Sequence, residues 1–397
     1  MSEIKTIGIL TSGGDAPGMN AAIRSVTRSA IFNGLKVKGI YRGFRGLITN
    51  EIVDFHTENV SNIIQRGGTI LKTARCKEFQ TPEGRQLAYD VARSHNIDAI
   101  VVIGGDGSLT GARIFANEFN FPMIGLPGTI DNDLFGTDHC PGFASAAKYI
   151  ATSITEVYQD SHVYDKGQVS IIEIMGRHAG WLAGAASLAA VTGYAADLVY
   201  LPEVDFNMDE FLEDVSALWE KNHNVIVAVS EGIHYADGSF VSEAKTSATD
   251  GFGHAQLGGL AAMLADVVKE KLGVKVRGIE LSLLQRCAAH CASQTDIDES
   301  FLAGQTAVNS AVAGETDKMV AFECSREGGY SCTTKLLNLS DVANYEKKVP
   351  VEWINERGNN VSQAFIDYAL PLIQGETKMP KENGLPRFAK LAKIVAE

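Results

Sequence analysis

The stretch VVIGGDGSLTGA, residues 101–112, decides the expected fold. An apolar run without alternation ends in two glycines, an aspartate, a third glycine and a serine. Such a run is typical of a parallel strand that helices cover on both faces. Glycines after the strand let a phosphate approach main-chain N–H groups at the start of the next helix. Asp106, set among these glycines, is placed like a ligand of Mg²⁺, directly or through water.

The same order of apolar run, glycine-rich turn and helical pattern recurs along the chain. We expect strands at 4–10, 35–41, 98–103 and 122–126, and, after a break near Gly142, at 169–175, 198–201, 225–230 and 276–281. Pro17 suits the first turn of a helix that runs to about Asn33. This alternation predicts an α/β protein with two doubly wound sheets. The C-terminal part of the chain has no pattern that we can assign.

Composition bounds the class of protein. The 397 residues suggest more than one domain, and the net charge of −13 argues against nucleic acid or an anionic membrane as a partner. The first residues lack the layout of a signal peptide, and no apolar run approaches the roughly 20 residues of a membrane span. We therefore expect a cytoplasmic protein. Cys287, His290 and Cys291 lack a second ligand pair, so we expect no metal there.

Three loops follow strands at what should be one edge of the first sheet. They are TSGGDAPG at 11–18, GGDGS at 104–108 and GLPGTIDND at 125–133. Ligands of such sheets bind at the carboxyl ends of the strands. One glycine-rich turn is a weak sign, whereas three after successive strands indicate a phosphate site. From position alone, Asp131 and Asp133 are equally compatible with catalytic work and with capping a turn.

Four segments together resemble the phosphofructokinase family. They are IGILTSGGDAPGMNAA at 7–22, VVIGGDGS, GLPGTIDND, and EIMGRHAG at 173–180. GGDG alone is shared with NAD kinases and lipid kinases, but TIDND followed by MGRH is far more specific. The resemblance extends from about residue 4 to about residue 290 and implies two Rossmann-like α/β domains around a shared active-site cleft. We expect a nucleotide- and magnesium-binding domain at 1–142 plus roughly 285–340, and a fructose 6-phosphate-binding domain at 143–284 plus roughly 341–397.

The resemblance also implies roles for single residues. Phosphoryl transfer needs a positioned carboxylate, a metal ion and cations. Asp131 would take the proton from the sugar's 1-hydroxyl, Thr129 would hold the 1-phosphate end, and Arg177 would stabilise the transferring group. Asp106 and Asp133 would hold Mg²⁺. The donor would contact Gly14, Arg75, Cys76, Gly105, Asp106, Gly107 and Ser108, and the sugar phosphate would contact Thr129, Ile130, Asp131, Met175, Gly176, Arg177, Glu231, Arg277 and Arg286.

Two glycines favour ATP as the phosphoryl donor. Family members that use pyrophosphate typically carry aspartate where this chain has Gly107 and lysine where it has Gly128. An aspartate there would repel the α-phosphate of a nucleotide, and a lysine would fill its space. The resemblance thus implies a glycolytic enzyme that converts fructose 6-phosphate to fructose 1,6-bisphosphate with ATP. Pyrophosphate is the alternative donor, because much of the chain resembles the longer branch of the family, which contains both donor types.

Two positions depart from the family's sugar-phosphate site. Gln168 and Leu283 stand where short bacterial members carry an arginine and a histidine. Lys166 could replace that arginine only as a point charge. These losses leave a third interpretation open, a regulatory subunit without catalysis, although the intact Asp106 and Asp131 oppose it. The resemblance further implies a homodimer or homotetramer with sites completed across an interface.

Overall fold

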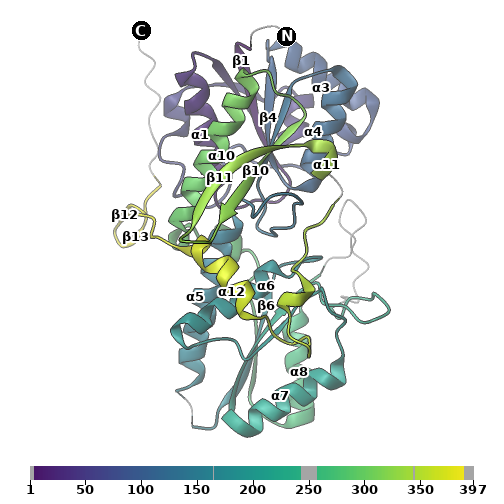
Figure 1. Ribbon diagram of the computed structural model, residues 1–397, viewed down its shortest axis with the longest axis vertical. Coiled ribbons are helices and arrows are strands. Elements are labelled where there is room, and N and C mark those ends of the chain that lie inside the picture. The colour runs from purple at the N-terminus through teal and green to yellow at the C-terminus, as the bar shows by residue number, and fades with distance from the viewer. Residues whose placement is uncertain (1–3, 164, 243–256, 343–344, 389–397) are drawn as a thin grey trace.

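The computed structural model describes residues 4–163, 165–242, 257–342 and 345–388. In these residues the chain forms a larger sheet with its helices in the upper half of Figure 1 and a smaller sheet with its helices in the lower half. The C-terminal segment around α12 runs between the two halves. No helix among the described residues is long and apolar enough to cross a membrane.

The larger sheet has seven strands in the order β11-β10-β5-β4-β1-β2-β3. The five central strands are parallel, whereas β3 and β11 pair antiparallel at the two edges. The strands are β1 (Thr6–Ser12), β2 (Lys36–Ile40), β3 (Ile52–Phe55), β4 (Ala99–Gly104), β5 (Met123–Pro127), β10 (Lys318–Ser325) and β11 (Ser331–Asn338).

The smaller sheet has four parallel strands in the order β7-β8-β6-β9. They are β6 (Gln168–Ile174), β7 (Leu198–Tyr200), β8 (Asn224–Ser230) and β9 (Val276–Glu280). A short hairpin of β12 (Lys381–Glu382) and β13 (Leu385–Pro386) lies near the C-terminal end of the described chain.

Helices connect the parallel strands and cover both sheets. The α-helices are α1 (Met19–Phe32), α2 (Gly43–Ile48), α3 (Pro82–Ser94), α4 (Asp106–Phe119), α5 (Phe143–Ser161), α6 (Trp181–Gly184), α7 (Met208–Asn222), α8 (Leu260–Leu272), α9 (Leu284–Cys287), α10 (Gln294–Val312), α11 (Leu339–Val342) and α12 (Gln363–Ala369). Short 3-10 turns occur at Thr57–Val60, Glu78–Gln80, Ala185–Thr192, Ala289–Cys291, Val351–Trp353 and Leu370–Ile373.

The predicted α/β class with doubly wound, Rossmann-like sheets is confirmed. All eight predicted strands are present, with ends displaced by at most two residues. The sequence did not reveal β3, β10 and β11: β3 and β11 are antiparallel edge strands without the strand-turn-helix pattern, and β10, although parallel to β5, lies in the C-terminal part to which no pattern could be assigned. Pro17 was placed wrongly: Gly18 caps α1 with a φ of 86°, and the helix begins only at Met19.

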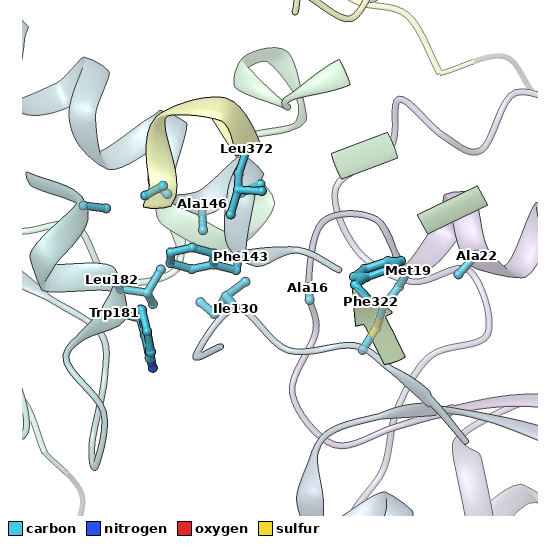
Figure 2. Packing of buried hydrophobic residues seen from close by; sticks show 14 of the residues in the cluster. Ala16, Met19, Ala22, Ile130, Phe143, Ala146, Trp181, Leu182, Phe322 and Leu372 are labelled. Atoms are coloured by element: carbon cyan, nitrogen blue, oxygen red, sulfur yellow. The ribbon is translucent and has the colours of Figure 1, made fainter. Parts of the chain in front are cut away.

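One apolar core ties the two sheets together. It runs from Met19 of α1 through Ile130 to Phe143 of α5 and Trp181 of α6, all of them buried. Figure 2 shows Ile130 beside Phe143 and Leu182, on the side of the loop that faces this core. Burying an aliphatic side chain contributes about 1.5–3 kcal/mol. Ile130 therefore anchors the loop that carries its neighbour Asp131. The domain boundaries given above remain a proposal.

Candidate active site

The three glycine-rich loops meet at one edge of the larger sheet because the strands that precede them are neighbours. Ser12 at the end of β1 pairs with Gly104 of β4, which pairs with Pro127 of β5. The loops line a cavity of about 1230 Å³. Met175, which follows β6, and Arg286 of α9 line the same cavity. The cavity therefore joins loops of both sheets.

Most predicted site residues line this cavity. They are Gly14, Arg75, Cys76, Gly105, Asp106, Gly107, Ser108, Thr129, Ile130, Asp131, Asp133, Met175 and Arg286. Gly176, Arg177, Glu231 and Arg277 are not among the lining residues. Two of these four, Gly176 and Glu231, bind each other next to the lining residue Met175, as described below.

The turn after β4 allows an anion to approach the start of α4. A side-chain carbon on Gly104 would collide with the main-chain oxygen of Ser12, so only glycine fits where these two paired strands end. A carbon on Gly107 would meet nothing within 4 Å. The helix that follows is 14 residues long, so its N-terminus carries positive potential toward the cavity. These features suit a bound phosphate.

The cavity also has an apolar end that the sequence did not reveal. Phe44, Phe79 and Ile114 line it beyond Gly107. The rings of Phe44 and Phe79 stack with their centroids 4.0 Å apart. These residues come from α2, a 3-10 turn and α4, so no single stretch of sequence contains a signal for this pocket.

The carboxylates at the centre repel one another. Burial raises the pKa of Asp131, the carboxylate of Glu231 raises it further, and the guanidinium of Arg286 opposes both. Burial likewise raises the pKa of Asp133, and Asp131, Glu346 and Asp106 add to this effect. The main-chain N–H of Asp131 donates to Thr129 Oγ1 at 3.2 Å. Such a gathering of carboxylates fits a divalent cation with oxygen ligands.

The loops of the smaller sheet hold Glu231 against the turn that contains Met175 and Gly176. The N–H of Gly176 donates to Glu231 Oε1 at 3.3 Å, and that of Met175 donates to Gln285 Oε1 at 3.4 Å. Burial raises the pKa of Glu231, against the effects of this hydrogen bond and of the Arg177 charge. Glu231 thus binds the residue that follows Met175, and the charge of Arg177 acts on Glu231. Arg277 lies apart from them, exposed on the edge strand β9.

A polar clamp behind the first loop positions the segment that carries Arg75. Asp15 Oδ1 accepts from the N–H of Thr69 at 2.9 Å, and burial raises the pKa of this carboxyl. The side chain of Asn20 donates to the Gly68 oxygen and accepts from the N–H of Ile70, each at 2.9 Å. Both Asp15 and Asn20 lie inside the motif quoted above, so their presence was visible but their task was not.

A lysine from the C-terminal segment supports the loop of Asp131 and Asp133 from behind. Lys347 donates through Nζ to Asp138 O at 2.6 Å and to Asn132 Oδ1 at 3.3 Å, and its N–H donates to Asp133 O at 2.7 Å. Burial lowers its pKa to about 8. The Trp181 ring lies 4.8 Å from Nζ. Nothing in the irregular sequence around Lys347 indicated this role.

Gln168 does not take over the task of the missing arginine. Its side chain is buried in β6, and Nε2 donates to Ser170 Oγ at 3.0 Å within the same strand. Leu283 and Lys166 are exposed and do not line the cavity. Arg286 is therefore the one of these predicted cations that lines the cavity on the side of Met175.

Comparisons with known proteins show to which family the chain is similar. The sequence model of the family described as Phosphofructokinase matches residues 6–308. The ATP-dependent 6-phosphofructokinase 2 of Bacteroides thetaiotaomicron is 54% identical over 244 residues, which cover 60% of this chain and 73% of that one. The pyrophosphate–fructose 6-phosphate 1-phosphotransferase of Halomonas elongata is 36% identical over 399 residues, which cover 96% of this chain and 95% of that one.

Solved structures give the same result for the fold. The pyrophosphate-dependent phosphofructokinase of Marinobacter aquaeolei superimposes with a TM-score of 0.85 and 33% identity, over 99% of this chain and 98% of that one. The phosphofructokinase of Pichia pastoris in the T-state gives a TM-score of 0.70 and 31% identity, over 86% of this chain and 38% of that one.

Proposed function

The chain belongs to the phosphofructokinase family, and on that premise we propose that it transfers the γ-phosphate of ATP to O1 of fructose 6-phosphate. The product is fructose 1,6-bisphosphate, and the enzyme is a phosphotransferase with an alcohol acceptor. We place this reaction in the cytoplasm, as a step of glycolysis.

The apolar end of the cavity is the observation that favours ATP over pyrophosphate as the donor. Phe44, Phe79 and Ile114 offer surface for a nucleotide base beyond the phosphate-binding turn, and pyrophosphate has no group that would use it. Gly107 leaves open space between the two regions. The relatives named as ATP-dependent point to the same donor, while the Halomonas elongata relative is named for pyrophosphate.

Gly128 supports ATP for a second reason. A side-chain carbon there would lie 2.9 Å from Ile103 Cγ2 and 3.2 Å from Met19 Cε, so a longer side chain needs its neighbours to shift. The lysine that pyrophosphate-using members typically carry at this position therefore does not fit the present packing. This chain carries neither residue of the pyrophosphate pattern, because both positions are glycine.

The chemistry assigned to the central residues follows from their surroundings. Asp131 accepts the proton of the 1-hydroxyl as that oxygen attacks phosphorus, and a raised pKa suits a general base. Asp106 and Asp133 are the residues that would hold Mg²⁺, which when bound neutralises charge on the donor phosphates. Arg75 and Arg177 supply fixed positive charge for the transferring group, and Gly14 and Ser108 lie against the donor.

The part of the site that would bind the 6-phosphate of the acceptor has fewer cations than in short members of the family. Arg286 lines the cavity and acts on Asp131 as well as on the 6-phosphate. Glu231, held by Gly176, faces a sugar hydroxyl, and Thr129 holds the 1-phosphate end. Because Gln168 and Leu283 add no cation, each missing charged hydrogen bond weakens binding by about 1.5–3 kcal/mol.

We extend the proposal to a homodimer or homotetramer. Arg277 is exposed on the edge strand β9 and outside the cavity of its own chain. A second copy that packs along this edge would bring Arg277 to its neighbour's 6-phosphate. Such an exchange would add a second cation to Arg286 at the 6-phosphate, while the lining residues Arg75 and Arg85 belong to the larger sheet's side of the cavity.

Steady-state kinetics with each donor test the proposed function. Purified protein, saturated with fructose 6-phosphate and Mg²⁺, is assayed with ATP and with pyrophosphate. We expect kcat/KM to be at least about 100-fold higher with ATP, because only the nucleotide uses the apolar end of the cavity. A preference for pyrophosphate would reverse the choice of donor. No turnover with either donor would identify a regulatory subunit.

A further inference from the structure

A second cluster of reactive side chains lies away from the cavity, where β10 and β11 meet α10. Its members are Asp138, His139, Glu299, Cys324, Tyr330 and Cys332. We propose that Cys324 and Cys332 form a modification site that low-molecular-weight disulfides, of the glutathione class, oxidise to an intramolecular disulfide. The proposal concerns a site separate from catalysis and does not depend on the proposed function.

The strand register places the two cysteines in the geometry that a disulfide needs. Cys324 of β10 is directly opposite Cys332 of β11. Two residues earlier, the N–H of Phe322 donates to Thr137 Oγ1 and its oxygen accepts from Asp138 N, so both groups point away from β11. Backbone orientation repeats every second residue, so Cys324 and Cys332 form a pair without mutual backbone hydrogen bonds. The Cα atoms of such pairs lie about 4.5 Å apart, inside the range of about 4.4–6.8 Å found for disulfides.

A charged histidine stabilises the thiolate of the attacking cysteine. His139 Nδ1 lies 3.8 Å from Cys324 Sγ and 3.0 Å from Asp138 Oδ1, while Nε2 lies 2.7 Å from Glu299 Oε2. These two carboxylates and the sulfur raise the pKa of the buried His139 despite its burial, so the ring is an imidazolium at neutral pH. The neighbouring Cys332 and His139 lower the pKa of Cys324 to about 6, against the effect of burial.

The same atoms do not make a ready metal site. Asp138, His139 and Cys324 each offer a ligand atom within 4.8 Å of the others. Arg326, however, binds both oxygens of Asp138, at 2.8 and 2.9 Å. Both nitrogens of His139 face carboxylates. Arg326 and His139 thus already occupy the positions in which a metal ion would be favoured. The thiolate of Cys324 is left as the reactive group.

The reaction proceeds by two exchanges. The thiolate of Cys324 attacks one sulfur of glutathione disulfide, forms a mixed disulfide and releases one glutathione thiolate, which takes up a proton. Cys332 then loses its proton to solvent, and its thiolate attacks the sulfur of Cys324 and expels the second glutathione. Two protein thiols are oxidised, and one glutathione disulfide is reduced to two thiols. Both cysteines are partly exposed, which admits the reagent.

Mass spectrometry of the full-length protein tests the site. Reduced protein, freed of reductant and metal ions, is incubated with glutathione disulfide near neutral pH and then mapped by peptide mass. We expect loss of two hydrogen masses and a Cys324–Cys332 cross-link that dithiothreitol reverses. In Cys332→Ser, we expect a glutathione adduct on Cys324 that forms about three- to ten-fold faster than on the exposed Cys287, because a larger thiolate fraction outweighs lower nucleophilicity.

The matched control is Cys287→Ser, which should form the same cross-link at the wild-type rate. The proposal is overturned if Cys324 and Cys332 stay free thiols while Cys287 carries glutathione. It is also overturned if Cys332→Ser shows no adduct on Cys324, since that variant retains the attacking thiol whatever its effect on the hairpin.

Discussion

At the scale of single residues, the proposed site depends on carboxylates that are held close together. Asp131 and Asp133 lie two residues apart on one loop, with the carboxylate of Glu231 facing Asp131. Apolar Ile130, which directly precedes Asp131, anchors the loop in the core, and Thr129 Oγ1 accepts from the N–H of Asp131. The residues to which we assign chemistry are thus held by neighbours to which we assign none.

The replacement Asp131→Asn tests the general base. We expect kcat to fall by about 10²–10⁴-fold, since the amide keeps the size of the side chain but cannot accept the proton. Initial rates with ATP at saturating fructose 6-phosphate measure the effect. The exposed Asp90→Asn on α3 is the control and should keep wild-type rates. A variant as fast as wild type would exclude Asp131 as the base.

The raised pKa of Glu173 in β6 leads to a prediction of how the free energy of unfolding depends on pH. Burial, with the charges of Glu280 and Glu231, raises its pKa from 4.5 to about 7, while Ala261 N–H donates to it at 2.9 Å. The folded state therefore keeps this proton at pH values where the unfolded chain has released it, so stability falls as the pH rises through that interval.

Glu173→Gln should remove this dependence, because an amide oxygen still accepts from Ala261. We expect equal stability near pH 4.5 and, near pH 8, a variant more stable than wild type by about 1–3 kcal/mol. Thermal unfolding at both pH values measures the difference. Glu220→Gln, exposed on α7, should follow wild type throughout. A variant that is less stable near pH 8 would contradict the expectation.

At the scale of elements, function depends on where strands stop and helices start. The turn between β4 and α4 is tight enough to need Gly104 and open enough at Gly107 to receive a donor. The loop after β5 is longer and is held from behind by the segment of Lys347. Local sequence determines the turn after β4, whereas a contact with the segment of Lys347 determines the loop after β5.

Gly107→Asp should weaken ATP use at the first turn of α4. A carboxylate fits the open space but repels the donor phosphates, so kcat/KM for ATP should fall by about 10- to 100-fold. Gly107→Ala fills the same space without charge and should change it by less than about 3-fold. If both variants lose activity equally, bulk rather than charge decides. If neither loses activity, the donor does not lie there.

Lys347→Met should act on turnover through the loop of Asp133. The methionine keeps an apolar stem beside Trp181 but releases the oxygens of Asp138 and Asn132. We expect kcat to fall by about 10- to 100-fold with a smaller change in the KM for ATP, since misplaced catalytic groups cost rate. The exposed neighbour Lys348→Met is the control. An unchanged kcat would assign Lys347 to stability alone.

At the scale of the whole molecule, the cavity is built by both sheets and the core that joins them. Loops of the larger sheet line one side of the cavity, while Met175 and Arg286 line it from the other side. Among the predicted site residues, Arg277 lies on the exposed edge of the smaller sheet and does not line the cavity of its own chain. Its place is explained if the working unit is larger than one chain.

Mixing two impaired variants, assayed at low fructose 6-phosphate, tests this assembly. Arg277→Ala should raise the KM for fructose 6-phosphate by about 10- to 150-fold through loss of a charged hydrogen bond. Co-expressed with Asp131→Asn, it should restore roughly a quarter of the wild-type sites in a statistical mixture of two-fold dimers. Lys271→Ala, exposed on α8, serves as control for the first measurement. Co-expression without recovery would place Arg277 outside the neighbour's site.

The sequence alone was sufficient for eight of the nine parallel strands, their order along the chain and the three loops at their ends. These features depend on local rules: apolar runs form buried strands, and glycines permit close approach of main chain and phosphate. Asp131 and Asp106 could be placed together for the same reason, because they lie inside those loops, and both line the cavity. The edge strands β3 and β11 follow no such local pattern, and parallel β10 leads into an antiparallel hairpin instead of a glycine-rich turn and a helix.

Contacts between distant segments were decided only by the tertiary structure. Lys347 reaches Asn132 across 215 positions of sequence, and the pocket of Phe44, Phe79 and Ile114 gathers three separate elements. The pairing of Cys324 with Cys332 beside His139 likewise needs the hairpin and the loop from β5 in place. Such neighbours are chosen by packing of the whole chain, because side chains far apart in sequence share a surface only after the core has formed around them.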